Sequence, residues 1–323
     1  MGAFTYHKPA TVGEAADLAA ELHGARFVAG GTDVVVLLKQ RKIDPANLIS
    51  LRNVAELTYI DSADGLSLGS GVTHTRIANH DYIRARYSAL ADGARVVGSK
   101  QIRNVATLGG NICNAAPSAD TACPLLALDA AVRILGREGE REVPIDDFFL
   151  GPNKVALADG ELVLGIKLPA TSEKSGSAYI KHSRRQAMEL PMVGVAAWVS
   201  VSIGGSEERC RGALECEHTP DVIQLLQNEE VVLEDVRIAM GVVAPRPIRA
   251  REAEAKLKGQ VVSGALFESM GDVAVSECQA RDSFRCDAGY RLEMVRVLTK
   301  RAILKAIDRI MRPGREADID LLW

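Results

Sequence analysis

The chain has 323 residues, of which 47% are hydrophobic, 4% aromatic and 25% charged, and its formal net charge is −3 at pH 7. This composition is typical of a soluble globular protein with one very large domain or two to three ordinary ones. A slightly acidic chain with few aromatic residues is not expected to bind nucleic acid, and no apolar run reaches the roughly 18 residues of a membrane helix. Because residues 1–11 lack the pattern of a signal peptide, a cytoplasmic location is expected.

The first 50 residues alternate between helix and strand patterns. Thr11, three residues before a glutamate, is typical of a helix start, and the apolar spacing that follows predicts a helix ending near residue 23. Short strands are predicted at residues 26–29 and 48–51, with a helix over 34–39 between them. This rhythm indicates an α/β layer.

The residues from 57 to 135 combine short strands, short helices and a glycine-rich loop. The predicted strands are 59–61, 66–71 and 130–135, the predicted helices are 75–82 and 88–98, and the predicted loop is 101–117.

A polar, small-residue stretch at 169–177 is the best candidate for a domain boundary. Beyond it, the patterns predict strands at 193–203 and 236–243 and helices at 249–257 and 288–310.

The first segment that suggests chemistry has a glycine pair between a strand and a helix. Its residues are Phe27, Val28, Ala29, Gly30, Gly31, Thr32, Asp33 and Val34. Paired glycines let main-chain N–H groups turn toward an anion, and a helix start adds partial positive charge, so the segment suits a pyrophosphate. Thr32 is able to donate to a phosphate oxygen, whereas the carboxylate of Asp33 is expected to cap nearby N–H groups. An ordinary surface turn is the alternative.

The second segment also has a glycine pair with short polar neighbours. Its residues are Thr107, Leu108, Gly109, Gly110 and Asn111. Asp120 follows before an apolar run, where its carboxylate is suited to bind a ribityl or ribose hydroxyl, or to cap the helix that begins there.

Other cofactor patterns are missing from the sequence. Neither glycine pair belongs to a G-x-G-x-x-G motif, and no phosphate-binding loop of nucleotide triphosphatases occurs. The six cysteines are scattered, so we expect idle or buried thiols and no bound metal. Cys210, Cys216 and His218 are metal-ligand types, but they lack a fourth ligand nearby and are expected in a solvated loop.

Several segments in order and register resemble one family. They are Phe4 to Thr11, Ala29 to Asp33, Gln101 to Asn111, Pro117 to Ala130, Tyr179 to Lys181, Arg184 to Met188, Val193 to Ala196, Val243 to Glu254, and Tyr290 with Arg291. The chain resembles the FAD-binding (medium) subunit of the molybdenum hydroxylases, the family of xanthine dehydrogenase, carbon monoxide dehydrogenase and 4-hydroxybenzoyl-CoA reductase.

The resemblance implies an α+β fold of three parts. Residues 1–56 and 57–173 would form a two-subdomain FAD-binding α/β fold of the vanillyl-alcohol-oxidase (PCMH) type. Residues 174–323 would form a C-terminal domain with a small antiparallel sheet and helices.

The resemblance also implies non-covalent FAD and a set of contacts to it. Residues 27–34 and 107–111 would hold the diphosphate, and Asp120 another polar part. Val97 and Gly98 would line the adenine side, while Val163 and Lys181 would lie near the isoalloxazine. The charge of Lys181 would stabilise an anionic reduced flavin, although a solvated strand lysine is the alternative. No residue of this chain is expected to act as a catalytic base or nucleophile.

The partners implied by the resemblance are a [2Fe-2S] small subunit and a molybdopterin large subunit, assembled as a dimer of heterotrimers. Electrons would pass from the clusters through FAD to NAD, a quinone or another acceptor. Two features depart from the family: Glu189 replaces a usual aspartate, and residues 204–230 form a longer stretch than usual.

Two other functions remain open from the sequence. A stand-alone FAD-dependent oxidase or reductase uses the same scaffold, and turnover by the isolated chain would identify it. A cofactor-free assembly module would lack flavin, although both glycine pairs and Asp120 are intact.

Overall fold

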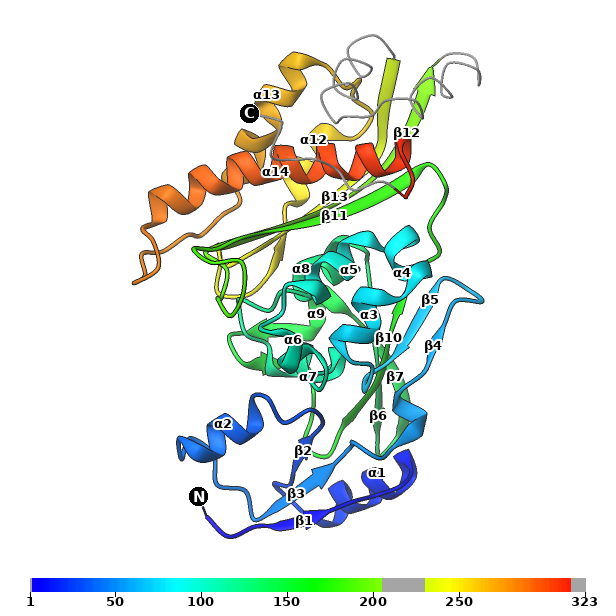
Figure 1. Ribbon diagram of the computed structural model, residues 1–323, viewed down its shortest axis with the longest axis vertical. Helices are drawn as coiled ribbons and strands as arrows, with labels where there is room; N and C mark the ends of the chain where they lie inside the picture. The colour runs from blue at the N-terminus through cyan, green and yellow to red at the C-terminus, as the bar shows by residue number, and fades with distance from the viewer. Residues whose placement is uncertain (1, 205–229, 315–323) are drawn as a thin grey trace.

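The computed structural model describes residues 2–204 and 230–314, and its three main sheets follow one another along the long axis (Figure 1). A three-stranded sheet lies at the N-terminal end, a five-stranded sheet in the middle and a four-stranded sheet at the C-terminal end. The predicted α+β fold class is confirmed.

The N-terminal sheet is parallel, with strand order β1-β3-β2. Its strands are β1 (Thr5–His7), β2 (Arg26–Val28) and β3 (Asn47–Ser50), and its helices are α1 (Val12–Glu21) and α2 (Val34–Lys39). The predicted cap is present, because Thr11 Oγ1 accepts from the N–H of Glu14 at 3.1 Å. The sequence did not predict β1, which is only three residues long and mostly exposed.

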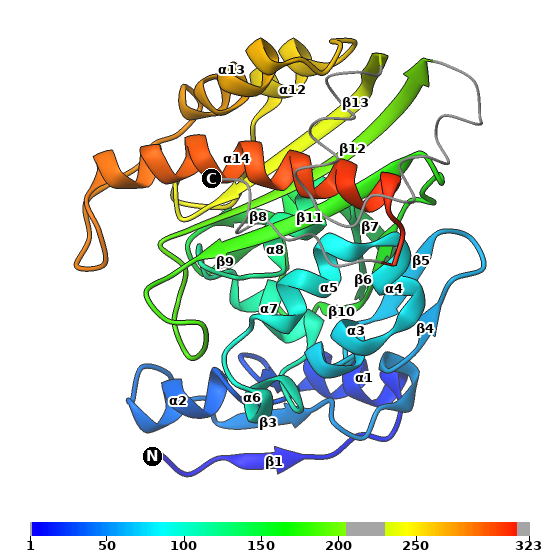
Figure 2. The same cartoon turned by 45° about the horizontal axis from the view of Figure 1, so that its top comes forward.

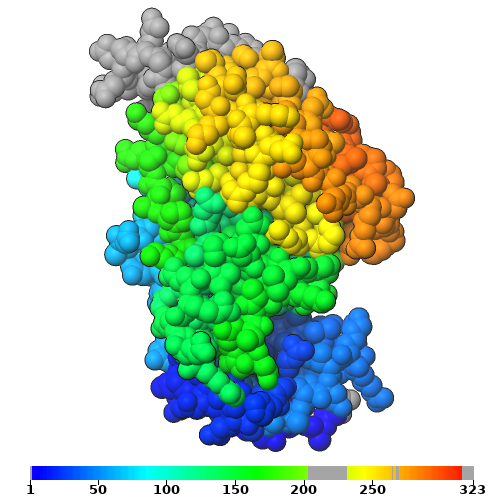
Figure 3. Space-filling view, turned by 180° about the vertical axis from the view of Figure 1, so that it is seen from behind, coloured from blue at the N-terminus to red at the C-terminus, as the bar shows by residue number. Residues whose placement is uncertain are grey.

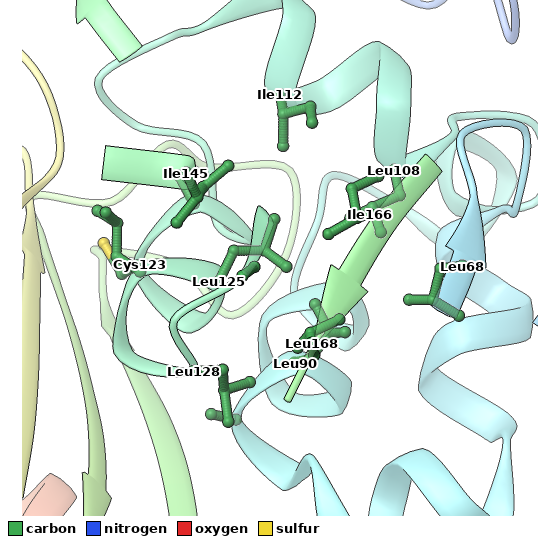
Figure 4. Close-up of a cluster of buried hydrophobic side chains, with 14 of the residues drawn as sticks. Leu68, Leu90, Leu108, Ile112, Cys123, Leu125, Leu128, Ile145, Ile166 and Leu168 are labelled. Carbon is green, nitrogen blue, oxygen red and sulfur yellow. The ribbon is translucent and has the colours of Figure 1, made fainter. Parts of the chain in front are cut away.

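The middle sheet is antiparallel, with strand order β4-β5-β10-β6-β7. Its strands are β4 (Ile60–Asp61), β5 (Leu66–Gly69), β6 (Ala131–Gly136), β7 (Gly139–Pro144) and β10 (Leu162–Leu168). The short elements around it are η1 (Ala55–Leu57), α3 (His74–Asn79), α4 (Asp81–Arg86), α5 (Ser88–Arg95), α6 (Lys100–Arg103), α7 (Leu108–Asn114), α8 (Ala122–Ala127), α9 (Ile145–Phe148), β8 (Phe149–Gly151) and β9 (Lys154–Val155). Leu108 and Ile112 of α7 join β10 residues such as Ile166 in one buried core (Figure 4).

Two of the predicted elements in this part are corrected. Residues 101–117, predicted as a loop, contain α6 and α7, because Ser99 and Thr107 cap these helices and α7 buries two apolar side chains. The predicted single helix 75–82 is instead α3 and α4, separated at His80, which has an extended backbone.

The C-terminal sheet is buried on both faces. Its strands are β11 (Ser175–His182), β12 (Val193–Gly204), β13 (Glu230–Gly241) and β14 (Ile248–Arg249), and its helices are α12 (Arg251–Leu257), α13 (Gly264–Val275) and α14 (Ala288–Met311). Helix α14 lies across one face, and α5 and α8 pack on the other (Figures 1 and 2). Side chains alternate along β11, so that Ala178 packs on the α14 side and Tyr179 packs on the side of the middle sheet.

Ion pairs between partly buried or buried side chains and their partners join the C-terminal part to the middle part. Asp92 of α5 accepts from Arg309 of α14 at 2.7 Å. Arg249 binds both Glu254 and Asp129. The predicted boundaries at residues 56 and 173 fall between the sheets and stay a prediction.

None of the helices in residues 2–204 and 230–314 combines the length and the apolar character that crossing a bilayer requires. In the same ranges, no three His, Cys, Asp or Glu side chains gather as a metal site would require. Cys210, Cys216 and His218 lie outside the described residues.

Candidate cofactor site

The two glycine segments lie against each other. A Cβ atom built on Gly30 would stand 2.0 Å from the carbonyl oxygen of Val105, so only glycine allows this approach. Asn114 Nδ2 also donates to Asp33 Oδ1 at 3.3 Å. The structure therefore brings together two segments that are about 75 residues apart in the chain, as one shared ligand would require.

A cavity of about 560 Å³ opens beside both segments. Its walls are residues 24–27, Ala29, Leu51, Ser70, Gly71, Gly109, Gly110, Cys113, Val155 and 157–163. Figure 3 shows the green surface of the middle of the chain meeting the blue surface of the N-terminal residues. The volume lies in the range of small-molecule and cofactor sites, and the predicted residues Phe27, Ala29, Gly109, Gly110 and Val163 all line it.

The first segment presents unpaired main-chain donors. Gly31 has a φ of +75°, and α2 begins where the N–H of Val35 donates to the Gly31 carbonyl at 3.0 Å. Within the described chain, the N–H groups of residues 30–33 donate no hydrogen bond. Residues 30–32 are half-buried and Asp33 is exposed. Partly buried amides without partners are costly unless a ligand or water accepts from them, so this loop fits an anion such as a phosphate.

The predicted role of Asp33 as a cap is wrong. Asp33 is the N-cap residue of α2, but its side chain makes no capping hydrogen bond. Its helical backbone conformation differs from the extended one of capping residues, and its carboxylate accepts from Asn114 instead.

The second segment uses its N–H groups inside the protein. Leu108 and Gly109 donate to the carbonyls of Val72 and Ser70, both at 2.9 Å, and Gly110 donates to Thr107 Oγ1 at 3.1 Å. A Cβ on Gly109 would stand 2.6 Å from the Ser70 Cβ. This glycine therefore lets α7 pack tightly against the end of β5, while the helix start forms a wall of the cavity.

Asp120 and Lys181 form a buried ion pair. Lys181 Nζ donates to Asp120 Oδ2 at 2.9 Å, and both side chains are 7% exposed. Tyr179 donates its hydroxyl to Asp120 Oδ1 at 3.0 Å. Burial raises the pKa of Asp120 to about 6, although the charge of Lys181 and both hydrogen bonds lower it.

Two sequence alternatives for this pair are wrong. Asp120 is not a helix cap, because Thr121 occupies the N-cap position of α8 and the Asp120 carboxylate binds β11 instead. Lys181 is not a solvated strand residue, because its side chain points with Tyr179 toward the middle part of the chain.

The remaining predicted residues connect the ion pair to the second segment. Thr121 Oγ1 donates to Asn111 Oδ1 at 2.6 Å. Lys181 Nζ also donates to the carbonyl of Val96 at 3.1 Å, directly before Val97 and Gly98. The predicted residues thus form one group at the cavity and a second group around Lys181, which does not line the cavity.

Other predicted residues stand behind these walls. Val28 and Leu108 are buried in the core, while Thr32 and Val34 flank the first loop and are half-buried. Glu189, the departure from the family, accepts from Arg185 Nε at 2.9 Å.

The sequence missed several residues of the site. The sequence indicates Tyr179 only as part of the Tyr179–Lys181 motif, although its position two residues before Lys181 places both side chains on one strand face. Ser70, Gly71 and residues 157–162 carried no pattern that indicated a cavity wall.

Two family models match this chain. One is described as the FAD binding domain in molybdopterin dehydrogenase and matches residues 2–171. The other is described as the CO dehydrogenase flavoprotein C-terminal domain and matches residues 222–306.

Individual proteins are similar over nearly the whole length. A putative xanthine dehydrogenase FAD-binding subunit of Escherichia coli (strain K12) is 32% identical over 306 residues, covering 94% of this chain and 96% of that protein. The carbon monoxide dehydrogenase medium chain of Hydrogenophaga pseudoflava is 27% identical over 302 residues, covering 93% and 96%.

Solved structures agree with the fold. Carbon monoxide dehydrogenase from Hydrogenophaga pseudoflava superposes with a TM-score of 0.82 at 28% identity, over 95% of this chain and 98% of that chain. Quinoline 2-oxidoreductase from Pseudomonas putida 86 gives a TM-score of 0.81 at 27% identity, over 96% and 98%.

Proposed function

Because this chain belongs to the family of FAD-binding subunits of molybdopterin-dependent dehydrogenases, we propose that it passes electrons from a partner chain through FAD to an acceptor. Membership of the family makes the chain an FAD-binding component of an oxidoreductase. The observation that carries the proposal is the meeting of two glycine segments beside one cavity, with unpaired amides in the first.

The residues present fit FAD. The unpaired N–H groups of residues 30–33 suit a diphosphate, and the cavity has room for a cofactor part lined by Phe27 and Val163. FAD supplies the capacity to accept and release electrons, so the chain needs no general base or nucleophile. The chain binds and orients the cofactor. We place the flavin ring toward the Asp120–Lys181 pair, which lies outside the cavity walls but is tied to the second segment through Thr121 and Asn111 and through the Val96 carbonyl, so that the pair sets the charge near the ring.

The partners are proposed from the relatives and the cysteines. Relatives carry the names medium chain and FAD-binding subunit, which imply companion chains. The six scattered cysteines of this sequence show no cluster-binding run. We therefore assign the [2Fe-2S] clusters and molybdopterin to a small and a large partner subunit, in a dimer of heterotrimers. NAD, a quinone or another molecule then takes the electrons.

The cytoplasmic location and the division into residues 1–56, 57–173 and 174–323 belong to the same proposal. The three sheets support the division, because each lies within one of these ranges.

Native purification tests the assembly. The protein should co-purify with two other chains, and FAD, molybdenum and iron should be present in fixed ratio to it. Protein that stays colourless with excess FAD would contradict the flavin assignment. Flavin without molybdenum and iron partners would contradict the assembly and favour a stand-alone oxidase or reductase.

A matched pair of glycine variants tests the site. Gly31 and Gly259 have φ values of +75° and +77°, so an alanine strains both backbones by about 1 kcal/mol. Only Gly31 lies in the first segment. We expect Gly31→Ala to bind FAD about fivefold more weakly, which corresponds to this strain, while Gly259→Ala binds FAD as the wild type does. Equal FAD affinity in both variants would remove the site from residues 27–34.

A further inference from the structure

The hydroxyl of Tyr179 is committed to one carboxylate. Tyr179 is buried, with only 4% of its surface exposed, and its hydroxyl donates to Asp120 Oδ1 at 3.0 Å. Lys181 occupies the other carboxylate oxygen at 2.9 Å. Both oxygens of an aspartate from the middle part therefore receive donors from one strand, β11.

The neighbouring strand β12 has a glycine where it passes the Tyr179 hydroxyl. Gly194 of β12 pairs with Lys181, and a Cβ on Gly194 would stand 2.5 Å from the Tyr179 hydroxyl oxygen. Any side chain at this position would push the hydroxyl away from Asp120. The main chain of Tyr179 is fixed as well, because its N–H donates to Asp92 Oδ2 at 3.1 Å.

We propose that Tyr179 is a positioning residue that acts through Asp120, holding its carboxylate ionised against Lys181 and so setting the charge beside the cofactor. The inference rests on the proposed function, which places Asp120 and Lys181 next to FAD. A hydrogen bond to a carboxylate stabilises the charged form, so losing the hydroxyl favours uptake of a proton from solvent. Protonated Asp120 leaves the cation of Lys181 uncompensated.

Among the described residues, the titratable groups that interact with the Asp120 carboxylate come from two elements. Lys181 and Tyr179 face it from β11, and Cys123 faces it from α8. Burial raises the pKa of the Cys123 thiol far above its ordinary value, and burial also raises the pKa of Tyr179, so both stay neutral. Asp120 is then the group that changes charge near neutral pH, because burial raises its pKa to about 6.

The variant Tyr179→Phe should make Asp120 bind a proton about tenfold more tightly, which is one unit in pKa. Between the two pKa values, the variant carries more positive charge beside the cofactor, so the midpoint potential of bound FAD rises above that of the wild type. Well above this range Asp120 is ionised in both proteins, and well below it Asp120 is neutral in both. The potential difference should therefore be a peak in pH and not a constant offset.

The experiment measures the FAD midpoint potential against pH in the purified complex. Tyr87→Phe is the matched control, because Tyr87 is also fully buried but donates to the carbonyl of Pro169 at 2.9 Å, which does not titrate. Its difference curve should be flat. Asp120→Asn should lack the inflection near pH 6, and Tyr179→Phe should move that inflection upward.

Site-specific 3-fluorotyrosine at position 179 gives a second measurement that preserves the hydroxyl and the packing. Its more acidic phenol is the stronger donor, so the inflection should move to lower pH. A Tyr179→Phe curve that overlays the wild type, a constant offset, or an unmoved inflection with fluorotyrosine would overturn the proposal. Wild-type protein without FAD would instead defeat the proposed function.

Discussion

The two Gly-Gly pairs have the same sequence but serve different physical purposes. At residues 30–31 the N–H groups stay unpaired in the described chain, and the glycine without a side chain lets two loops meet. At residues 109–110 the N–H groups are already bonded, and the glycine lets a helix start pack against Ser70. A glycine pair therefore does not identify a phosphate loop by itself. What distinguishes the two pairs is whether their main-chain N–H groups are already hydrogen-bonded within the protein.

The largest effect should come from Gly30→Ala. The new Cβ would stand 2.0 Å from a main-chain oxygen, which cannot yield as a flexible side chain does, so the two segments must separate. We expect FAD to bind about 1000-fold more weakly, or about 4 kcal/mol. Titration of apoprotein with FAD measures this, and an affinity within a few fold of wild type would mean that the contact between the segments is unimportant for the ligand.

Acid should weaken the second segment selectively, through His74. This histidine is fully buried beside Ala106, and within the described residues neither ring nitrogen has a hydrogen-bond partner. Burial, with the nearby Arg103, lowers the pKa of His74 from 6.5 to about 4. The stability that neutral His74 provides is complete above pH 6.5 and is lost as pH falls toward 4, by about 3 kcal/mol.

Urea unfolding across this pH range, compared with His74→Leu, measures the loss. The variant should lack this part of the pH dependence. If wild type and variant lose stability in parallel, the protonation of other groups explains the acid sensitivity.

The contrast between the two positions of the second pair gives a smaller effect. A Cβ at Gly109 would stand 2.8 Å from the Ser70 carbonyl oxygen, whereas a Cβ at Gly110 would meet the Thr107 hydroxyl at 3.0 Å. We expect Gly109→Ala to lower the free energy of unfolding by about 2 kcal/mol and Gly110→Ala to change it by less than about 1 kcal/mol. Equal losses in thermal unfolding would show that the packing on Ser70 does not explain this glycine.

The smallest effect concerns the cap. Thr107→Ala should lower the free energy of unfolding by about 1 kcal/mol, because Gly110 loses its acceptor, and Thr107→Ser should restore most of it. FAD affinity should change little in both. A large loss of affinity with unchanged stability would instead place the hydroxyl on the ligand.

Local patterns predicted much of the fold. The cap at Thr11, helix α2 and the long apolar stripe of α14 depend on residues within a few turns of each other, and all were recovered. Helix α7 was missed because its glycine pair has low helix propensity, which the burial of Leu108 and Ile112 overrides. Helix α6 was missed because it has only four residues, none of them buried, so no apolar spacing marks it.

The sequence predicted the glycines of the site but not the hydrogen-bond partners of its two aspartates. Asp120 looked like a cap because its partners, Tyr179 and Lys181, lie about 60 residues later on another sheet. The sequence predicted a capping role for Asp33 because its actual hydrogen-bond partner, Asn114, lies 81 residues later in the chain. Such partners follow from tertiary packing, which no local pattern specifies.

The ion pair between Asp92 and Arg309 has a consequence for the timing of biosynthesis. The two residues are 217 positions apart, so the ribosome releases the cation long after the anion. A partly buried carboxylate without its counter-charge is unfavourable, so we expect α5 to reach its final place on the last sheet only after Arg309 has been synthesised. With Lys181 of β11 placed near FAD as proposed, we expect flavin loading to follow completion of the polypeptide.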